Sequence, residues 1–155
     1  MNRIHLRTGI FRKDVDARRL REAVHKTLAH QEFPVNGELT LVITDDDELR
    51  RLNRQYRGAD KPTDVLSFGE SAFDVPVLPD ESVYLGDVII SYPRAQAQAP
   101  AAGHTTSDEL VLLAVHGVLH LLGHDHATPG EKRKMWAAQD AIMREMGAQV
   151  TLARR

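Results

Sequence analysis

The sequence predicts an α+β fold, in which a small mixed four-stranded sheet packs with about five helices in one domain spanning residues 1–155. Segments rich in β-branched residues alternate with segments of helical periodicity. An apolar run over residues 110–122 is interrupted only by histidines and glycine, so we expect a central, buried, histidine-bearing helix. The 155 residues, 42% hydrophobic and 27% charged, suit a globular domain with a substantial core.

The first part of the chain is expected to form a strand, a helix and a second strand. Residues 2–7 and 38–44 have the composition of strands. Between them, apolar residues recur every four positions as the core stripe of a helix, and Asp14 or Asp16 is placed to cap its N-terminus. The residues of this stripe are Leu20, Val24 and Leu28.

A second helix is expected directly after the 38–44 strand. The acidic run 45–48 places oxygen acceptors and negative charge at a helix start, where both are favourable, and Gly58 is placed to end the helix. Arginines spaced by four and three residues give this helix one basic face. A solvated surface is the ordinary explanation of such a pattern. The spaced residues are Arg50, Arg54 and Arg57, with Arg51 beside them and Lys61 just after.

Two further strands are expected at 65–68 and 83–90, joined by a loop over residues 69–82. The loop holds two prolines and four acidic residues, so we expect an irregular surface segment. Loops of this length are uncommon unless functional or disordered, and we expect this one to border the active-site cleft and to move. Gly86, inside the second strand, indicates a bulge, a close approach of backbone to substrate, or simple bending.

Three helices are expected in the remainder of the chain. Residues 91–99 form a short helix that stops at Pro100. The histidine-bearing helix follows, and a last helix ends at Gly147, leaving residues 148–155 as a tail that we expect to be disordered. Each of these two helices begins with a capping box. The boxes are residues 106–109 and 128–131.

Three histidines at the end of the central helix predict a metal site. His116 and His120 are four residues apart and therefore lie on one helical face. Gly123 can adopt the left-handed conformation that ends a helix and folds the chain back, which brings His126 into reach. Zn²⁺ held by three neutral imidazoles, with a fourth position left to water, is the usual catalytic zinc site. A hydrogen-bonded core histidine is the alternative for any one of them.

The same spacing occurs in metzincin zinc peptidases, but one position argues against that class. Those enzymes carry their general-base Glu directly after the first histidine, and here that residue is Gly117. Glycine in mid-helix costs about 1 kcal/mol relative to alanine. It indicates either that another backbone or a substrate passes close by, or that the helix packs tightly. An amide or peptide hydrolase would need a carboxylate from elsewhere in the fold.

Residues 116–126, His-Gly-Val-Leu-His-Leu-Leu-Gly-His-Asp-His, resemble the signature of the bacterial YbeY family, metal-dependent endoribonucleases that mature ribosomal RNA. Residues 52–57, 62–68 and 85–89 match the family as well, and the resemblance spans roughly residues 37–147. The family usually has Tyr at the position of His124, a departure that leaves the three ligand positions intact.

The resemblance implies a zinc-dependent endoribonuclease, with one Zn²⁺ per chain, that acts on single-stranded RNA in ribosomal RNA maturation and ribosome quality control. Ribosomal subunits or assembly factors are the implied partners. Zinc lowers the pKa of a bound water to about 7. Either this water, or the hydroxide formed from it, attacks the phosphodiester, or the metal polarises the phosphodiester. His116 and Arg57 are the candidate catalytic residues, since a guanidinium fork matches phosphate oxygens. The candidate substrate-binding residues are Arg50, Arg54, Arg57 and Lys61.

Other side chains near the histidines have open roles. Asp125 can accept the distal N–H of a histidine or stabilise the turn. His104 and His124 are expected to face solvent.

The competing class is a metal-stabilised, non-catalytic RNA-binding factor in ribosome assembly, whose metal would have a fourth protein ligand.

Composition sets limits on partners and location. The net charge of −2 and the pI near 6.4 do not indicate nucleic-acid binding, so any RNA contact must be a local patch. The absence of Cys excludes disulfides and thiolate metal ligands. The N-terminus lacks the apolar core of a signal peptide, and no apolar run is long enough to span a bilayer. We therefore expect a cytoplasmic protein without membrane contact.

Overall fold

A four-stranded sheet and the helices around it make up the computed structural model, which describes residues 2–34, 36–69 and 83–148. The predicted α+β class is confirmed. In chain order the elements are β1 (Arg3–Arg7), the 3-10 helix η1 (Gly9–Asp14), α1 (Ala17–His30), β2 (Gly37–Thr44), α2 (Asp46–Arg57), β3 (Val65–Gly69), β4 (Val83–Ser91), α3 (Tyr92–Ala102), α4 (Thr106–Leu121) and α5 (Pro129–Glu145).

The sheet has the strand order β1-β2-β4-β3 and is mixed, as predicted. Strands β1, β2 and β4 are parallel, and β3 pairs antiparallel with β4 at the edge. Gly86 in β4 has a φ of +137°, and a Cβ there would lie 2.1 Å from the carbonyl oxygen of Phe68 on β3. The register of β2 against β4 also shifts beside it, between Glu38 and Leu39. This glycine therefore marks a bulge and a close approach of the neighbouring strand.

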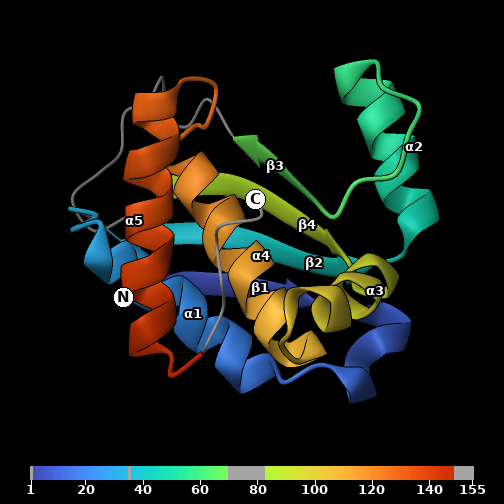
Figure 1. Ribbon diagram of the computed structural model, residues 1–155, viewed down its shortest axis with the longest axis horizontal. Coiled ribbons are helices and arrows are strands. Elements are labelled where there is room, and N and C mark those ends of the chain that lie inside the picture. The colour runs from blue at the N-terminus through green and yellow to red at the C-terminus, as the bar shows by residue number, and fades with distance from the viewer. Residues whose placement is uncertain (1, 35, 70–82, 149–155) are drawn as a thin grey trace.

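The helices cover the two faces of the sheet unequally (Figure 1). Because side chains alternate along a strand, one set from β2 and β4 enters a large core shared with α1, α4 and α5. The opposite set packs under α2 in a smaller cluster of its own. The buried members of that smaller cluster are Leu49, Leu66 and Ile89.

Helix α4 is the predicted central helix. It packs against α1, α3 and α5 and lies on β3 and β4. From Glu109 to Leu121 every residue is buried except His116 and His120. The two histidines are therefore the accessible side chains of this stretch, and the helix presents both to the same site.

The start of α4 differs from the prediction in two ways. The cap is Thr105, whose hydroxyl accepts a hydrogen bond from the amide of Asp108, so the box at 106–109 was placed one residue late. His104, expected in solvent, has a side chain only 1% exposed and pairs with the fully buried carboxylate of Glu109 at 3.1 Å. A buried carboxylate needs a partner, and the histidine five residues earlier, just before the helix, provides it.

The end of α3 was also predicted wrongly. The helix continues through Pro100 to Ala102 and ends at Gly103, which has a φ of +79°. Proline removes only its own amide donor, and two further residues complete the last turn without it. Asp16, Asp45 and Thr128 are the N-terminal caps of α1, α2 and α5, in agreement with the sequence, and α5 ends at Glu145, two residues before the predicted Gly147.

Two expectations concern parts of the chain outside the described residues. The predicted mobile loop over 69–82 lies outside them except for Gly69, and the predicted tail over 148–155 lies outside them except for Ala148, which is buried. Of the helices in the described ranges, none combines the length and apolar character needed to cross a membrane.

Candidate metal centre

The three predicted histidines come together at the C-terminal end of α4. One ring nitrogen from each of His116, His120 and His126 lies within 4.8 Å of the other two. Two nitrogens bound to one Zn²⁺ at about 2.1 Å are at most about 4.2 Å apart, so small rotations of the rings bring all three onto one ion. The three side chains therefore fit a single metal.

The turn after α4 places the third histidine. Gly123 has a φ of +99°, and its amide donates to the carbonyl of His120 at 3.0 Å. The amide of His124 donates to the carbonyl of Leu119, also at 3.0 Å. The carboxylate of Asp125 accepts a hydrogen bond from the backbone amide of His126 at 2.7 Å. Of the two roles considered for Asp125, this contact favours stabilisation of the turn.

A glutamine on α5 fixes the tautomer of the first histidine. The Oε1 of Gln139 accepts a hydrogen bond from Nδ1 of His116, at 2.5 Å, and Gln139 is fully buried. A histidine that donates from Nδ1 keeps the lone pair of Nε2 for a metal. This contact is an independent indication that His116 is prepared as a ligand.

Burial keeps the first two histidines neutral. It lowers the pKa of His116 to about 4, although the hydrogen bond to Gln139 acts in the opposite direction. The pKa of His120 is also lowered, first by burial and then by the neighbouring His126. Metals bind the neutral imidazole, so both side chains are in the binding form at pH 7.

A cleft of about 850 Å³ opens in front of the histidines. Its opposite wall comes from the end of α2, the following connection and β3. Asn53, which is buried, holds this wall by donating from Nδ2 to the carbonyl of Lys61 at 3.0 Å. The charged and polar residues lining the cleft include Arg57, Lys61, Asp64, Ser67, Asp125 and the three histidines.

Only part of the predicted basic face reaches this cleft. Arg57 lines it and donates from Nη2 to the carbonyl of Ser67 at 3.2 Å. Lys61 lines it as well. Arg50 instead pairs with Asp60 at 2.8 Å, and neither it nor Arg54 is among the residues of the cleft. The structure thus brings two of the four candidate substrate-binding residues to the histidines.

Comparison with known proteins establishes the family. The sequence matches the family model described as Endoribonuclease YbeY over residues 8–147. The chain belongs to the YbeY family. Among curated relatives, the Endoribonuclease YbeY of a Dehalococcoides mccartyi strain is 45% identical over 145 residues, covering 88% of this chain and 84% of the relative. That of a Chloroflexus aurantiacus strain is 47% identical over 135 residues, covering 85% and 88%.

A solved structure has the same fold. The solution structure of TM1509 from Thermotoga maritima superposes with a TM-score of 0.61 at 27% sequence identity. The superposition covers 94% of this chain and 89% of that chain. This chain and the Thermotoga maritima protein therefore share one fold over nearly their whole lengths.

The glycine that replaces the peptidase Glu is explained by packing. A Cβ on Gly117 would lie 2.4 Å from Cγ1 of Val88 on β4 and 3.2 Å from Oγ of Ser67 on β3. Ser67 also donates from Oγ to the carbonyl of Gly117 at 3.0 Å. Of the two explanations offered for this glycine, tight packing of α4 on the sheet is the one observed.

Two features of this YbeY-family site were not foreseen. Gln139 was missed, although a polar residue on the apolar stripe formed by Met135 and Ile142 was a usable signal. His124, expected in solvent, is half-buried and hydrogen bonded to Oε1 of Gln31 at 2.6 Å. Burial lowers the pKa of His124, with smaller contributions from Lys134 and His30. This imidazole thus ties the turn to α1.

Proposed function

We propose that this chain is a zinc-dependent endoribonuclease that cuts single-stranded RNA in ribosomal RNA maturation and ribosome quality control. One observation carries the proposal: three histidines close enough to share one metal line a cleft that Arg57 and Lys61 also line. Membership of the YbeY family supports the reaction class. Ribosomal subunits or assembly factors are the partners that the proposed pathway requires.

The donor set suits Zn²⁺. The cluster offers three nitrogen ligands, and imidazole is a good ligand for zinc. When bound, zinc polarises a phosphate oxygen and lowers the pKa of a coordinated water to about 7. This removes the need for a general base beside the first histidine, where Gly117 stands. His116, His120 and His126 are the proposed ligands.

Arg57 is proposed to hold the scissile phosphate. Its guanidinium group is exposed at the cleft, and the hydrogen bond to the carbonyl of Ser67 holds it against β3. Ser67 is in turn bonded to Gly117 next to the first ligand, so Arg57 and the histidines belong to one connected frame. The planar fork of Arg can bind two phosphate oxygens and stabilise the charge that develops on them. Lys61 adds a second positive charge to the same wall.

Single-stranded RNA is the proposed substrate because the basic groups are few and local. Two cationic side chains along one wall can follow one phosphate backbone, whereas a duplex presents two. Sequence-tolerant binding of this kind depends on charge and is weakened by salt.

The test is cleavage of an end-labelled single-stranded ribosomal RNA fragment and of its duplex by metal-stripped and zinc-reloaded protein. We expect zinc to restore cleavage of the single strand. His116→Ala should lose both metal and activity, and Arg57→Ala should keep its metal but lose about 10²- to 10³-fold in kcat, as for other removed charge-stabilising donors. Arg51→Ala is the matched control, because Arg51 lies on the same helix but pairs with Glu48.

Intact RNA after treatment with zinc-loaded protein, with His116→Ala behaving identically, would overturn the proposal. If the protein then still bound RNA, the non-catalytic assembly factor would remain as the explanation. If Arg57→Ala cut as fast as Arg51→Ala, the assigned role of Arg57 would be wrong.

A further inference from the structure

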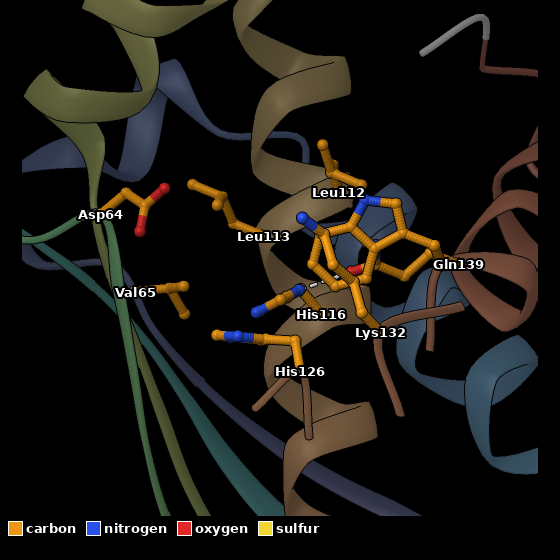
Figure 2. A pocket seen from close by; sticks show the side chains of 9 residues that line it. Asp64, Val65, Leu112, Leu113, His116, His126, Lys132 and Gln139 are labelled. Atoms are coloured by element: carbon orange, nitrogen blue, oxygen red, sulfur yellow. Dashed lines mark hydrogen bonds between the residues drawn. The ribbon is translucent and has the colours of Figure 1, made fainter. Parts of the chain in front are cut away.

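A second, smaller pocket opens beside the histidines (Figure 2). It lies between the start of β3 and α5, with α4 as its floor, and encloses about 210 Å³. Its walls are mainly apolar, and it shares His116 and His126 with the metal centre. The apolar residues are Val65, Leu112, Leu113 and Trp136.

The pocket contains a buried donor that has no acceptor among the described residues. Gln139 is fully buried and lines the pocket, and its Oε1 is occupied by His116. Among the described residues, none accepts a hydrogen bond from its Nε2. A buried N–H without an acceptor destabilises the protein, and a ligand that supplied an acceptor would remove that cost.

An aromatic side chain, a cation and the carboxylate of Asp64, on the β3 side, complete the pocket. The ring of Trp136 stands at a steep angle to those of His116 and His126, with centroids 5.8 Å from each. The Nζ of Lys132, which is exposed, lies 5.6 Å from the centroid of the Trp136 ring. The pocket therefore combines an aromatic wall, a hydrogen-bond donor in its lining, and one positive and one negative side chain, Lys132 and Asp64.

We propose that this pocket binds one nucleobase of the RNA, from a nucleotide next to the phosphate that is cut. The inference rests on the proposed function, since it assigns the pocket to the same substrate. Unpaired RNA bases are commonly splayed out, stacked on aromatic side chains and hydrogen bonded along their edges. Each of these needs has a counterpart here: Trp136 stacks the base, and Gln139 donates to a carbonyl oxygen or ring nitrogen. Lys132 holds the adjoining phosphate.

The size and position of the pocket support this occupant. At about 210 Å³ the pocket is much smaller than the cleft of about 850 Å³, so it suits one ring system rather than several nucleotides. His116 and His126 line both this pocket and the larger cleft. A base in the pocket would therefore lie beside a phosphate in front of the histidines.

The sole tryptophan of the chain provides a test that needs no cleavage. Trp136 is that residue, so the intrinsic fluorescence at tryptophan wavelengths reports on this pocket alone. We expect nucleoside 5′-monophosphates to quench the fluorescence of zinc-loaded protein saturably, and ribose 5-phosphate, which lacks the base, to leave it unchanged. Free tryptophan amide, titrated in parallel, corrects for absorption by the bases.

Cleavage of RNA containing one abasic nucleotide tests whether the pocket binds a base of the RNA substrate. Moving the abasic site along the strand should lower kcat/KM by about 5- to 150-fold at one position beside the cut, the range for stacking of one base. Trp136→Ala should lose a similar factor on intact RNA and no longer distinguish the abasic strand. Trp136→Phe should restore most of the discrimination, and both variants should retain their zinc.

The outcomes separate this inference from the proposed function. Quenching by nucleotides without any RNA cleavage would support the base-binding pocket and overturn the proposed nuclease function. RNA cleavage without quenching, and without an abasic effect at any position, would overturn the assignment of a base to this pocket. Equal losses by Trp136→Ala on intact and abasic RNA would also overturn it, because they would show a structural role for the ring.

Discussion

Replacing Gly117 by alanine tests how α4 is held on the sheet. Alanine gains about 1 kcal/mol over glycine inside a helix. Against this, its Cβ would lie 2.4 Å from Cγ1 of Val88, which is fully buried and has no flexible end to move aside. Overpacking of this kind costs about 1–3 kcal/mol, and loss of the bond from Ser67 to the Gly117 carbonyl costs about 1 kcal/mol more. We expect a net destabilisation of about 1–3 kcal/mol.

Urea unfolding of metal-free protein measures the effect, with Val88→Ala and the double variant completing a cycle. If Val88 is the obstacle, the cost of Gly117→Ala should largely vanish in the Val88→Ala background, giving a coupling energy of about 1–2 kcal/mol. Stabilisation by about 1 kcal/mol in both backgrounds would refute this explanation of Gly117. The glycine would then have to serve substrate approach instead.

Two further predictions concern the first histidine. Gln139→Met removes the acceptor from Nδ1 of His116 at similar volume and should lower zinc affinity about 10- to 100-fold in chelator competition; unchanged affinity would show that this hydrogen bond does not prepare the ligand. Because the pKa of His116 is lowered from 6.5 to about 4, the unfolded state binds protons more readily. Metal-free protein should therefore lose up to about 3 kcal/mol of stability as pH falls from 6.5 to 4, and His116→Gln should flatten that loss.

The fold was predictable where its signals are local. Caps such as Asp45 and Thr128 and the glycine stop at Gly58 act within one turn, so the sequence displays them directly. The errors arose where distant or competing groups decide. His104 is buried because Glu109 faces the core, and Pro100 is tolerated because α3 ends soon after it.

The histidine cluster was predictable for the same reason, and its surroundings were not. His116, His120 and His126 lie on one helix and its turn, so spacing alone brings them together. Gln139 and Trp136 come from α5, and only packing places them at the site.

The basic face of α2 shows a related limit. Residues Leu49 and Asn53 face the protein, and Arg57 follows them at the same four-residue step. Arg50 and Arg54 lie further round the helix and do not line the cleft. Charge spacing predicted the basic face, but the burial of Leu49 and Asn53 decided which arginine lines the cleft together with the histidines.

The most direct test of the metal centre is X-ray absorption spectroscopy of protein loaded with one equivalent of zinc. We predict one tightly bound ion with three imidazole nitrogens and one oxygen ligand from solvent. The three-imidazole signal should be lost in His116→Ala. A shell of four protein ligands, or zinc that fails to bind at one equivalent, would contradict an open metal centre facing the cleft.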